Sequence, residues 1–323
     1  WIIQKILNDP GGMHNRVTRH LHVQPFTLSE AREYLDAQHI ELTDTDFART
    51  YMALGGIPYY LKSLQRGDSF ATAIERICFQ PTGALFREYR NLFKALFRNA
   101  AAHEAIVSTL AQHPAGLGRT ALSSAAGIRS QSVASRVIEE LTASDFITYE
   151  LAHKGKKRGA RYRLTDEFTL FYQQFMASGQ QAPGWMQQVR SPRYRSWAGI
   201  AFELLCRKHV GRITDALGIS VLHNWTGPLH LPPTDADAGV QIDLLIDRPD
   251  DTVNLCEMKF YAEPFTLDKA GALELLRKKA RVRSYFKDRK QVVITVVTNH
   301  PAVENKWFRE VIDQQVTLAE LIA

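Results

Sequence analysis

The sequence contains little cysteine, and its thiols lie far apart. Only Cys78, Cys206 and Cys256 occur in the 323 residues, each within an apolar run and without a neighbouring cysteine. Scattered cysteines in odd number argue against a disulfide framework and against a zinc site of the CxxC type. A reducing compartment fits this usage best, and we expect a cytoplasmic protein.

Long apolar runs are also missing. No stretch reaches the roughly 18 residues that a membrane span needs, and no signal peptide is visible, so we expect no membrane partner. The composition, 45% hydrophobic and 23% charged, is ordinary for a globular chain of roughly two or three domains. A formal net charge of +6 permits contact with nucleic acid without establishing it.

A phosphate-binding P-loop is the third absence. The pattern G-x-x-x-x-G-K followed by Ser or Thr, whose backbone cradles nucleotide phosphates, occurs nowhere in the chain. We therefore expect no ATP hydrolysis by this chain alone. The sequence also opens on WIIQKILND without a methionine, which suggests that an N-terminal part is missing.

Helical patterns occupy the first half of the sequence. From Phe26 to about Tyr89 the pattern is helical, with Thr27 and Ser29 as candidate caps and a break at GGIP. Residues 91–112 predict one long helix. Two shorter helical patterns follow, 118–128 and 130–147, and then two strand-like runs around a basic, glycine-containing loop in 148–168. Helix, turn, helix and basic hairpin is the order of a winged helix.

The second half has a different rhythm. Residues 179–194 are rich in Gly, Pro, Gln and Arg and predict a linker. The remainder reads as helix, strand, strand, helix, strand and a last helix, which predicts an α/β domain with a mixed sheet. These segments are 196–210, 240–248, 252–260, 267–287, 291–299 and 302–312.

Charged side chains interrupt two of the predicted strands. In NLCEMKF, strand periodicity places Glu257 and Lys259 on one face and Cys256, Met258 and Phe260 on the other. Asp243 is a second carboxylate in an apolar strand. The midpoint between Asp243 and Glu257 falls in the turn-like RPDD, so a hairpin closed there brings the two carboxylates nearly opposite each other.

Converging carboxylates in a partly dry site repel each other unless a cation lies between them, and Mg²⁺ or Mn²⁺ suits oxygen ligands. We expect Asp243 and Glu257 to bind the ion. Lys259 would hold the attacking water or steady the charge on the phosphate, and Glu203 would assist from the preceding helix. The alternative for Glu257 and Lys259 is an ordinary solvated ion pair.

These residues resemble the core of the PD-(D/E)XK nucleases, although Ile242 replaces the proline usual before the first aspartate. More narrowly, IDLLIDR and LCEMKF, followed by a Lys- and Arg-rich helix, resemble the C-terminal domain of archaeal-type ATPases, a domain of unknown function. WIIQKILNDPGG and the residues after it, up to EYL, resemble the end of the P-loop domain of that family, and GGIPYYL resembles its lid. The resemblance implies the fold of a magnesium-dependent phosphodiesterase. Some members of that superfamily have lost the catalytic activity and retain only binding.

The resemblance implies an α/β multidomain chain of a helical lid, a winged helix-turn-helix and a restriction-endonuclease-like domain with a mixed sheet. The expected divisions are 1–98 for the ATPase tail and lid, 99–178 for the winged helix, 179–194 for the linker and 195–323 for the nuclease-like domain. Gly56, Ile57 and Pro58 would approach nucleotide, with ATP bound only in a full-length parent that has the P-loop domain. The alternative for GGIP is a simple helix-breaking turn.

Basic side chains suggest DNA as a partner. The expected recognition helix presents Ser130, Gln131, Ser132, Ser135 and Arg136 near its start, where such helices touch base edges. The expected wing carries Lys154, Lys156, Lys157, Arg158, Arg161 and Arg163, and the later helix carries Lys269, Arg277 and Lys278. The alternatives are a winged helix that only packs against its neighbours and a solvated helix face.

The sequence thus predicts metal-dependent hydrolysis of DNA phosphodiester bonds, regulated in a parent protein by ATP turnover, with a homodimer possible. A catalytically silent module that binds DNA or protein is the rival hypothesis. A third, an ATP-driven switch, would need the missing P-loop.

Overall fold

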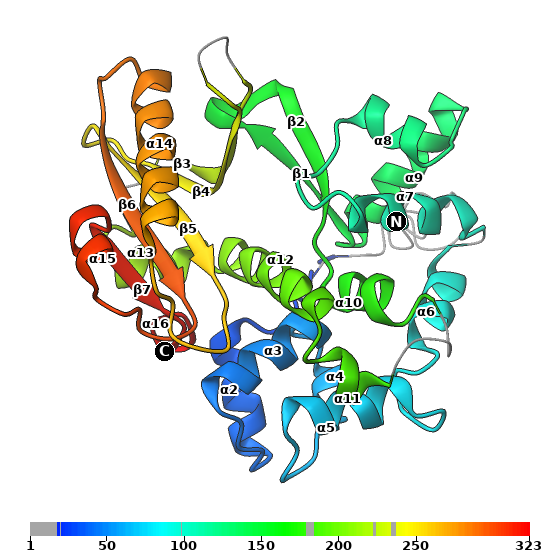
Figure 1. Ribbon diagram of the computed structural model, residues 1–323. Helices are drawn as coiled ribbons and strands as arrows, with labels where there is room; N and C mark the ends of the chain where they lie inside the picture. Colours follow the sequence, from blue (N-terminus) through cyan, green and yellow to red (C-terminus); the bar gives the residue numbers. More distant parts are fainter. Residues whose placement is uncertain (1–17, 20, 98, 179–183, 222–223, 234–236) are drawn as a thin grey trace.

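The computed structural model describes residues 18–19, 21–97, 99–178, 184–221, 224–233 and 237–323. It is a mixed α/β structure in which helices surround a two-stranded and a five-stranded sheet (Figure 1). About half of the segment that resembles the end of a P-loop domain, residues 1–17 and 20, lies outside the described residues.

The first described elements are short helices with side-chain caps. Thr27 and Glu30 form a capping box at the first of them, as expected for Thr27, and Thr43 and Ser69 cap two others. The elements are α2 (Leu28–Ala37), α3 (Asp44–Leu54), α4 (Pro58–Leu61), α5 (Phe70–Ile74) and the π-helical turn η1 (Glu75–Phe79).

The GGIP turn between α3 and α4 has a packing explanation. Gly55 ends α3 with a φ of 68°, a conformation that favours glycine. A Cβ on Gly56 would lie 1.9 Å from the carbonyl oxygen of Phe26, whose N–H donates to the Gly56 carbonyl at 2.7 Å. Pro58 is the first residue of α4, where proline is favoured. These contacts account for the motif without nucleotide, and nucleotide contact at Gly56 and Pro58 stays a prediction.

The prediction of one long helix over 91–112 is wrong, because the helix is interrupted at Phe97. Helix α6 (Glu88–Leu96) ends there, and α7 (Ala101–Ala111) begins four residues later. Phe97 is extended and buried, and its ring stacks on that of His103 at 3.9 Å. Burial of this aromatic ring outweighs helix continuity, which periodicity alone does not reveal.

Helices α8 (Arg119–Ala125) and α9 (Gln131–Ala143) precede a hairpin of β1 (Ile147–Ala152) and β2 (Lys156–Leu164). The expected basic loop is wrong in its extent: only the single turn η2 (His153–Gly155) separates the strands, and most of the basic residues lie in β2. The two strands pair antiparallel from Ile147 with Leu164 to Ala152 with Lys156, so most of the basic residues belong to a paired strand. Helix α10 (Glu167–Phe175) follows.

The segment expected as a linker is partly packed into the core. It contains α11 (Trp185–Gln188), in which Trp185 has no exposed surface and stacks on Phe79 at 5.3 Å between ring centroids. Helix α12 (Pro192–Lys208) then begins inside the expected linker. A four-residue helix is too short to produce a periodic pattern, so composition suggested a linker here.

The five-stranded sheet has the order β3-β4-β5-β6-β7. Strands β3 to β5 are antiparallel, and β5 to β7 are parallel. The mixed sheet and the expected helix-strand-strand-helix-strand order are confirmed, with further elements around them. The elements are α13 (Val210–Ala216), β3 (Trp225–Leu231), β4 (Val240–Asp247), β5 (Thr252–Lys259), α14 (Lys269–Tyr285), β6 (Gln291–Thr298), α15 (Lys306–Val311), β7 (Gln314–Thr317) and α16 (Leu318–Ile322).

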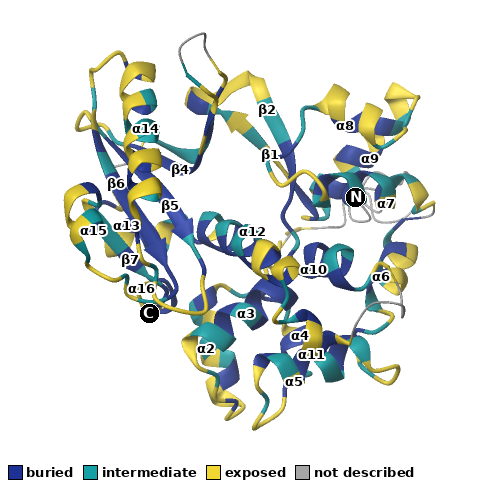
Figure 2. Cartoon of the chain, viewed as in Figure 1, coloured by how far each residue is buried: buried dark blue, intermediate teal, exposed yellow. Residues whose placement is uncertain are grey.

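Helices cover both faces of this sheet, whose central strands are buried (Figure 2). Cys256 and Met258 of β5 belong to the large core that includes α12, whereas Val253 and Leu255 pack in the core beneath α14. The predicted alternation of NLCEMKF between two faces is confirmed. Within the described residues, no helix is long and apolar enough to cross a membrane.

The GGIP turn gives a stability prediction. Gly56→Ala places a Cβ against the Phe26 backbone and should lower the free energy of unfolding by at least about 2 kcal/mol, measured by denaturant unfolding. Gly199→Ala in α12 is the control, because a Cβ there meets no atom within 4 Å and alanine favours helix. Equal stability of Gly56→Ala and wild type would contradict the packing explanation.

Candidate active site

Asp243 and Glu257 lie side by side on the β4–β5 hairpin. The paired residues run from Asp247 with Val253 to Leu244 with Cys256, so Asp243 and Glu257 are the next residues on the two strands. The predicted register and turn are therefore confirmed. The N–H of Met258 donates to Asp243 Oδ2 at 3.0 Å, which ties the two strands together at the site.

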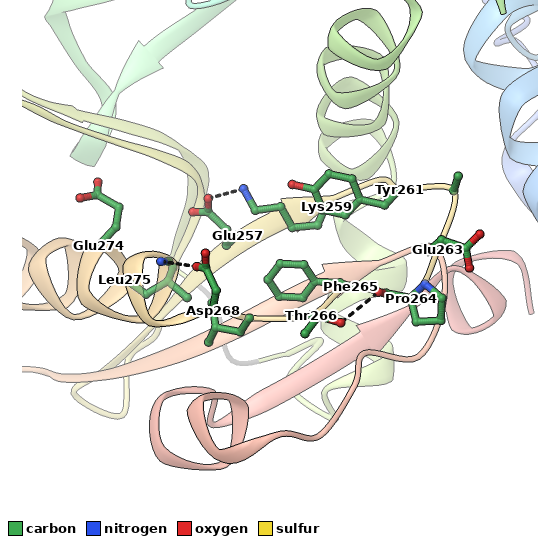
Figure 3. A pocket seen from close by; sticks show the side chains of 13 residues that line it. Glu257, Lys259, Tyr261, Glu263, Pro264, Phe265, Thr266, Asp268, Glu274 and Leu275 are labelled. Carbon is green, nitrogen blue, oxygen red and sulfur yellow. Dashed lines mark hydrogen bonds and ion pairs between the residues drawn. The ribbon is translucent and has the colours of Figure 1, made fainter. Parts of the chain in front are cut away.

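Two lysines bind the buried carboxylate of Glu257. Lys259 Nζ donates to Glu257 Oε1 at 2.8 Å, as Figure 3 shows, and Lys278 Nζ of α14 donates to Oε2 at 2.6 Å. Glu257 is only 7% exposed. Glu257 and Lys259 therefore form the ion pair of the alternative interpretation, but its carboxylate is buried rather than solvated.

The protonation equilibria reflect this arrangement. Burial, followed by the charges of Glu257 and Glu203, raises the pKa of Asp243 to about 7. Burial opposes ionisation of Glu257, but Lys259 and Lys278 outweigh it and hold the pKa of Glu257 below its usual value. Burial also acts against the charge of Lys259, yet Glu257 raises the pKa of Lys259, so its ammonium stays protonated at neutral pH.

Glu203 approaches the site from α12 without contacting it directly. Its nearest charged partner is Arg207 on the same helix, at 3.9 Å. Burial raises the pKa of Glu203, Arg207 and Arg163 oppose the shift, and Glu257 adds to it. Glu203 thus belongs to the electrostatic environment of Asp243 and Glu257.

The carboxylate oxygens of Asp243 and Glu257 are ligands of the kind that Mg²⁺ binds. Among the described residues, no group of three His, Cys, Asp or Glu side chains is arranged to hold a metal. Mg²⁺, however, is commonly held by one or two carboxylates together with water and substrate phosphate. Asp243 and Glu257 provide two such carboxylates, and a cation beside them would compete with Lys278 for Glu257 Oε2.

A cavity of about 620 Å³ opens beside Glu257 and Lys259. Residues 261–268 form its wall together with the first turns of α14 (Figure 3). Tyr261 is 47% exposed and stacks on Phe265, with 6.1 Å between ring centroids. Sequence reasoning missed this loop, because it lacks periodicity, although its place directly after LCEMKF was a usable signal.

The structure gives the basic residues of α14 different environments. Lys278 was expected on the phosphate backbone but contacts Glu257, because it follows Leu275 by three residues on the sheet-facing side. Arg277 pairs with Glu274 and Asp237, at 2.8 and 3.0 Å. Lys269 begins α14, is exposed and does not line the cavity.

The hairpin β1–β2 also divides its basic residues. Lys154, Lys156, Lys157 and Arg158 are exposed. Arg161 donates to the Gly116 carbonyl at 2.8 Å, and the buried Arg163 pairs with Glu150. On α9, Gln131 and Arg136 are exposed, and Arg136 lies 3.3 Å from Glu140.

The turn of this hairpin is docked on the five-stranded sheet. His153 is buried, and its ring nitrogens lie 2.9 Å from Asp247 Oδ2 and 3.0 Å from the Tyr285 hydroxyl. Arg163 further contacts His230 of β3 at 3.1 Å. The hairpin therefore packs against the sheet through its turn and one edge, while its outer basic residues remain exposed.

Comparison with known proteins adds little to this geometry. No family model matches the chain, and no curated protein matches it. The crystal structure of protein VC1899 from Vibrio cholerae is similar at a TM-score of 0.29 and 10% sequence identity, over 96% of this chain and 62% of that one. The chain thus spans less than two thirds of that protein, and a likeness of this extent carries no argument about fold or function.

The raised pKa of Asp243 predicts a pH-dependent cost in stability. A carboxyl whose folded-state pKa of about 7 exceeds its ordinary value of 3.8 costs nothing below pH 3.8, and the cost grows up to about pH 7. Asp243→Asn keeps an acceptor for the Met258 N–H and should raise the unfolding free energy at pH 8 by up to about 4 kcal/mol, at about 1.4 kcal/mol for each pKa unit.

The gain should be smaller at pH 5, because Asp243 is then protonated in the folded protein and the remaining cost is only that of protonating a carboxyl whose unfolded-state pKa is 3.8. Urea unfolding at both pH values measures the difference, with the exposed Asp215→Asn as the control. A variant that is less stable than wild type by the same amount at both pH values would contradict the assignment.

Proposed function

We propose that the chain carries a metal-dependent phosphodiesterase site for DNA, centred on Asp243, Glu257 and Lys259. The observation that carries this proposal is the meeting of two buried carboxylates and a protonated lysine at one edge of a hairpin, beside an open cavity. The resemblance to PD-(D/E)XK nucleases rests on the same residues. The wider assignment to the C-terminal part of an archaeal-type ATPase is part of this proposal.

Asp243 and Glu257 would hold Mg²⁺ or Mn²⁺, and the bound ion would neutralise phosphate charge and lower the pKa of a water molecule. Lys259 is protonated and donates hydrogen bonds, so it would orient the water or stabilise charge on a phosphate oxygen rather than accept a proton. Lys278 would steady Glu257 or move to the phosphate when a cation takes its place. Glu203 would assist by adding negative potential around Asp243.

In this proposal residues 99–178 form a winged helix that binds DNA through α9 and the exposed residues of the hairpin. The helix order and the adjacent antiparallel strands support it. Residues 1–98 would include the helical lid, and 195–323 would be the restriction-endonuclease-like domain. ATP would act only in a longer protein with a P-loop domain.

Cleavage assays test the site directly. We expect cleavage of plasmid or oligonucleotide DNA in Mg²⁺ or Mn²⁺, reduced about 100-fold or more in Glu257→Gln and in Lys259→Met. Thermal unfolding of each variant separates lost chemistry from lost folding. Lys279→Met on α14 is the control, because Lys279 pairs with Asp313 at 3.4 Å and does not contact Glu257.

The rival function is a catalytically silent module that binds DNA or protein. Its specific support is that both oxygens of Glu257 are already hydrogen-bonded to lysines, as they would be in a purely structural site. If the folded wild-type protein binds DNA but does not cleave it with Mg²⁺ or Mn²⁺, the rival function is favoured and the nuclease proposal is contradicted.

DNA binding by the hairpin can be tested separately. Removing three exposed cations by Lys156→Ala, Lys157→Ala and Arg158→Ala should weaken DNA binding about tenfold or more and flatten its salt dependence. Fluorescence anisotropy at several salt concentrations measures both effects. The control removes two exposed cations, Lys306 and Arg309 of α15, and a loss as large per cation removed as in the hairpin variant would argue for non-specific attraction only.

A further inference from the structure

A second cavity lies between helices that take no part in the proposed nuclease site. It has a volume of about 800 Å³, within the range of about 300–1,000 Å³ typical of small-molecule sites. Elements η1, α6, α10 and α11 contribute to it, in the lower right of Figure 1. Neither Gly56 nor Pro58 lines it, so it differs from the nucleotide position expected from the sequence.

One side of the cavity is cationic. Arg87, Arg90 and Lys94 line it. Arg90 and Lys94 lie four residues apart and share one face of α6, and Arg87 directly precedes the helix. All three are exposed, and none forms an ion pair with another described residue. A helix rises by about 6 Å over the four residues from Arg90 to Lys94, so these cations can contact neighbouring phosphates of one chain.

The other side is aromatic. Phe79 and Trp185 stack at 5.3 Å with an angle of 12° between their ring planes. Phe86, Tyr172 and Phe175 also line the cavity. Such walls bury the flat faces of planar aromatic ligands.

Two buried polar atoms at this cavity have no hydrogen-bond partner among the described residues. They are Nε1 of Trp185, a residue with no exposed surface, and Oε2 of Glu75. Both residues line the cavity. An unsatisfied buried donor or acceptor is costly, and both atoms belong to the wall of this cavity.

The π-helical turn η1 supplies Glu75 and Phe79 to the cavity together. Such turns are rare and occur frequently at functional sites, because the extra residue changes which side chains point the same way. The geometry of this segment is thus consistent with a binding role.

We propose that this cavity binds a free nucleoside phosphate. The base would lie against the partly exposed rings of Phe79 and Phe86, and Glu75 would accept a hydrogen bond from a base amino group. The phosphates would contact Arg87, Arg90 and Lys94. Inorganic phosphate would leave the aromatic wall unused, and a neutral nucleoside would leave the cations unused.

Isothermal titration of the whole chain with ATP, GTP, CTP and UTP, without added metal, tests this proposal. We expect at least one nucleotide to bind at micromolar concentration, with its nucleoside and tripolyphosphate each at least tenfold weaker. The double variant Arg90→Ala, Lys94→Ala should weaken binding at least tenfold, because both side chains are exposed and their removal should leave the fold intact. Glu75→Gln should change the preference among the four bases.

The control variant lacks Lys306 and Arg309 of α15 and should bind as wild type does. Three results would overturn the proposal: no nucleotide binding by folded protein at millimolar concentration, binding that the α6 variant leaves unchanged, or tripolyphosphate binding as tightly as the nucleotide. Tighter binding of a short single-stranded oligonucleotide than of any free nucleotide would also overturn it, in favour of nucleic acid at this surface.

Discussion

The structure around the candidate site depends on how the buried carboxylate of Glu257 is compensated. Lys259 comes from the same strand and Lys278 from α14, so this carboxylate joins the sheet to the helix that covers it. Burying one ion costs several kcal/mol, and removing a partner from a buried pair leaves that cost uncompensated. The position of α14 over β5, and hence one wall of the cavity, is coupled to the charge of Glu257.

The same compensation explains why the neighbouring carboxyls behave differently. Both ammonium groups, of Lys259 and Lys278, bind Glu257. Asp243 accepts one hydrogen bond from the Met258 N–H and forms no ion pair with the described residues. Burial and the charge of Glu257 therefore raise the pKa of Asp243, whereas the two lysines lower that of Glu257. One site thus holds an ionised carboxylate and a carboxyl poised near neutral pH, which a cation would stabilise in its charged form.

Local patterns predicted the site better than they predicted the fold around it. The hairpin register followed from the symmetric placement of Asp243 and Glu257 about a turn, because register is fixed once the turn is fixed. Strand β3 escaped prediction, because Gly227 and Pro228 resemble a turn but sit beside a bulge on an edge strand, where proline is tolerated. The break at Phe97 and the contact of Lys278 depend on tertiary packing, which no single segment contains.

Strand β4 contains an internal comparison that bears on function. Asp243 and Asp247 are both buried, at 8% and 4% exposure, and point to the same face four residues apart. Asp247 binds His153 and Lys290, and these contacts hold the hairpin turn and the loop between α14 and β6 against the sheet. A carboxylate with a structural role has such partners, because an unpaired buried charge is costly. Asp243 lacks such partners and lies among the charges of Glu257 and Glu203 instead, an arrangement that the cation of the proposed function would stabilise.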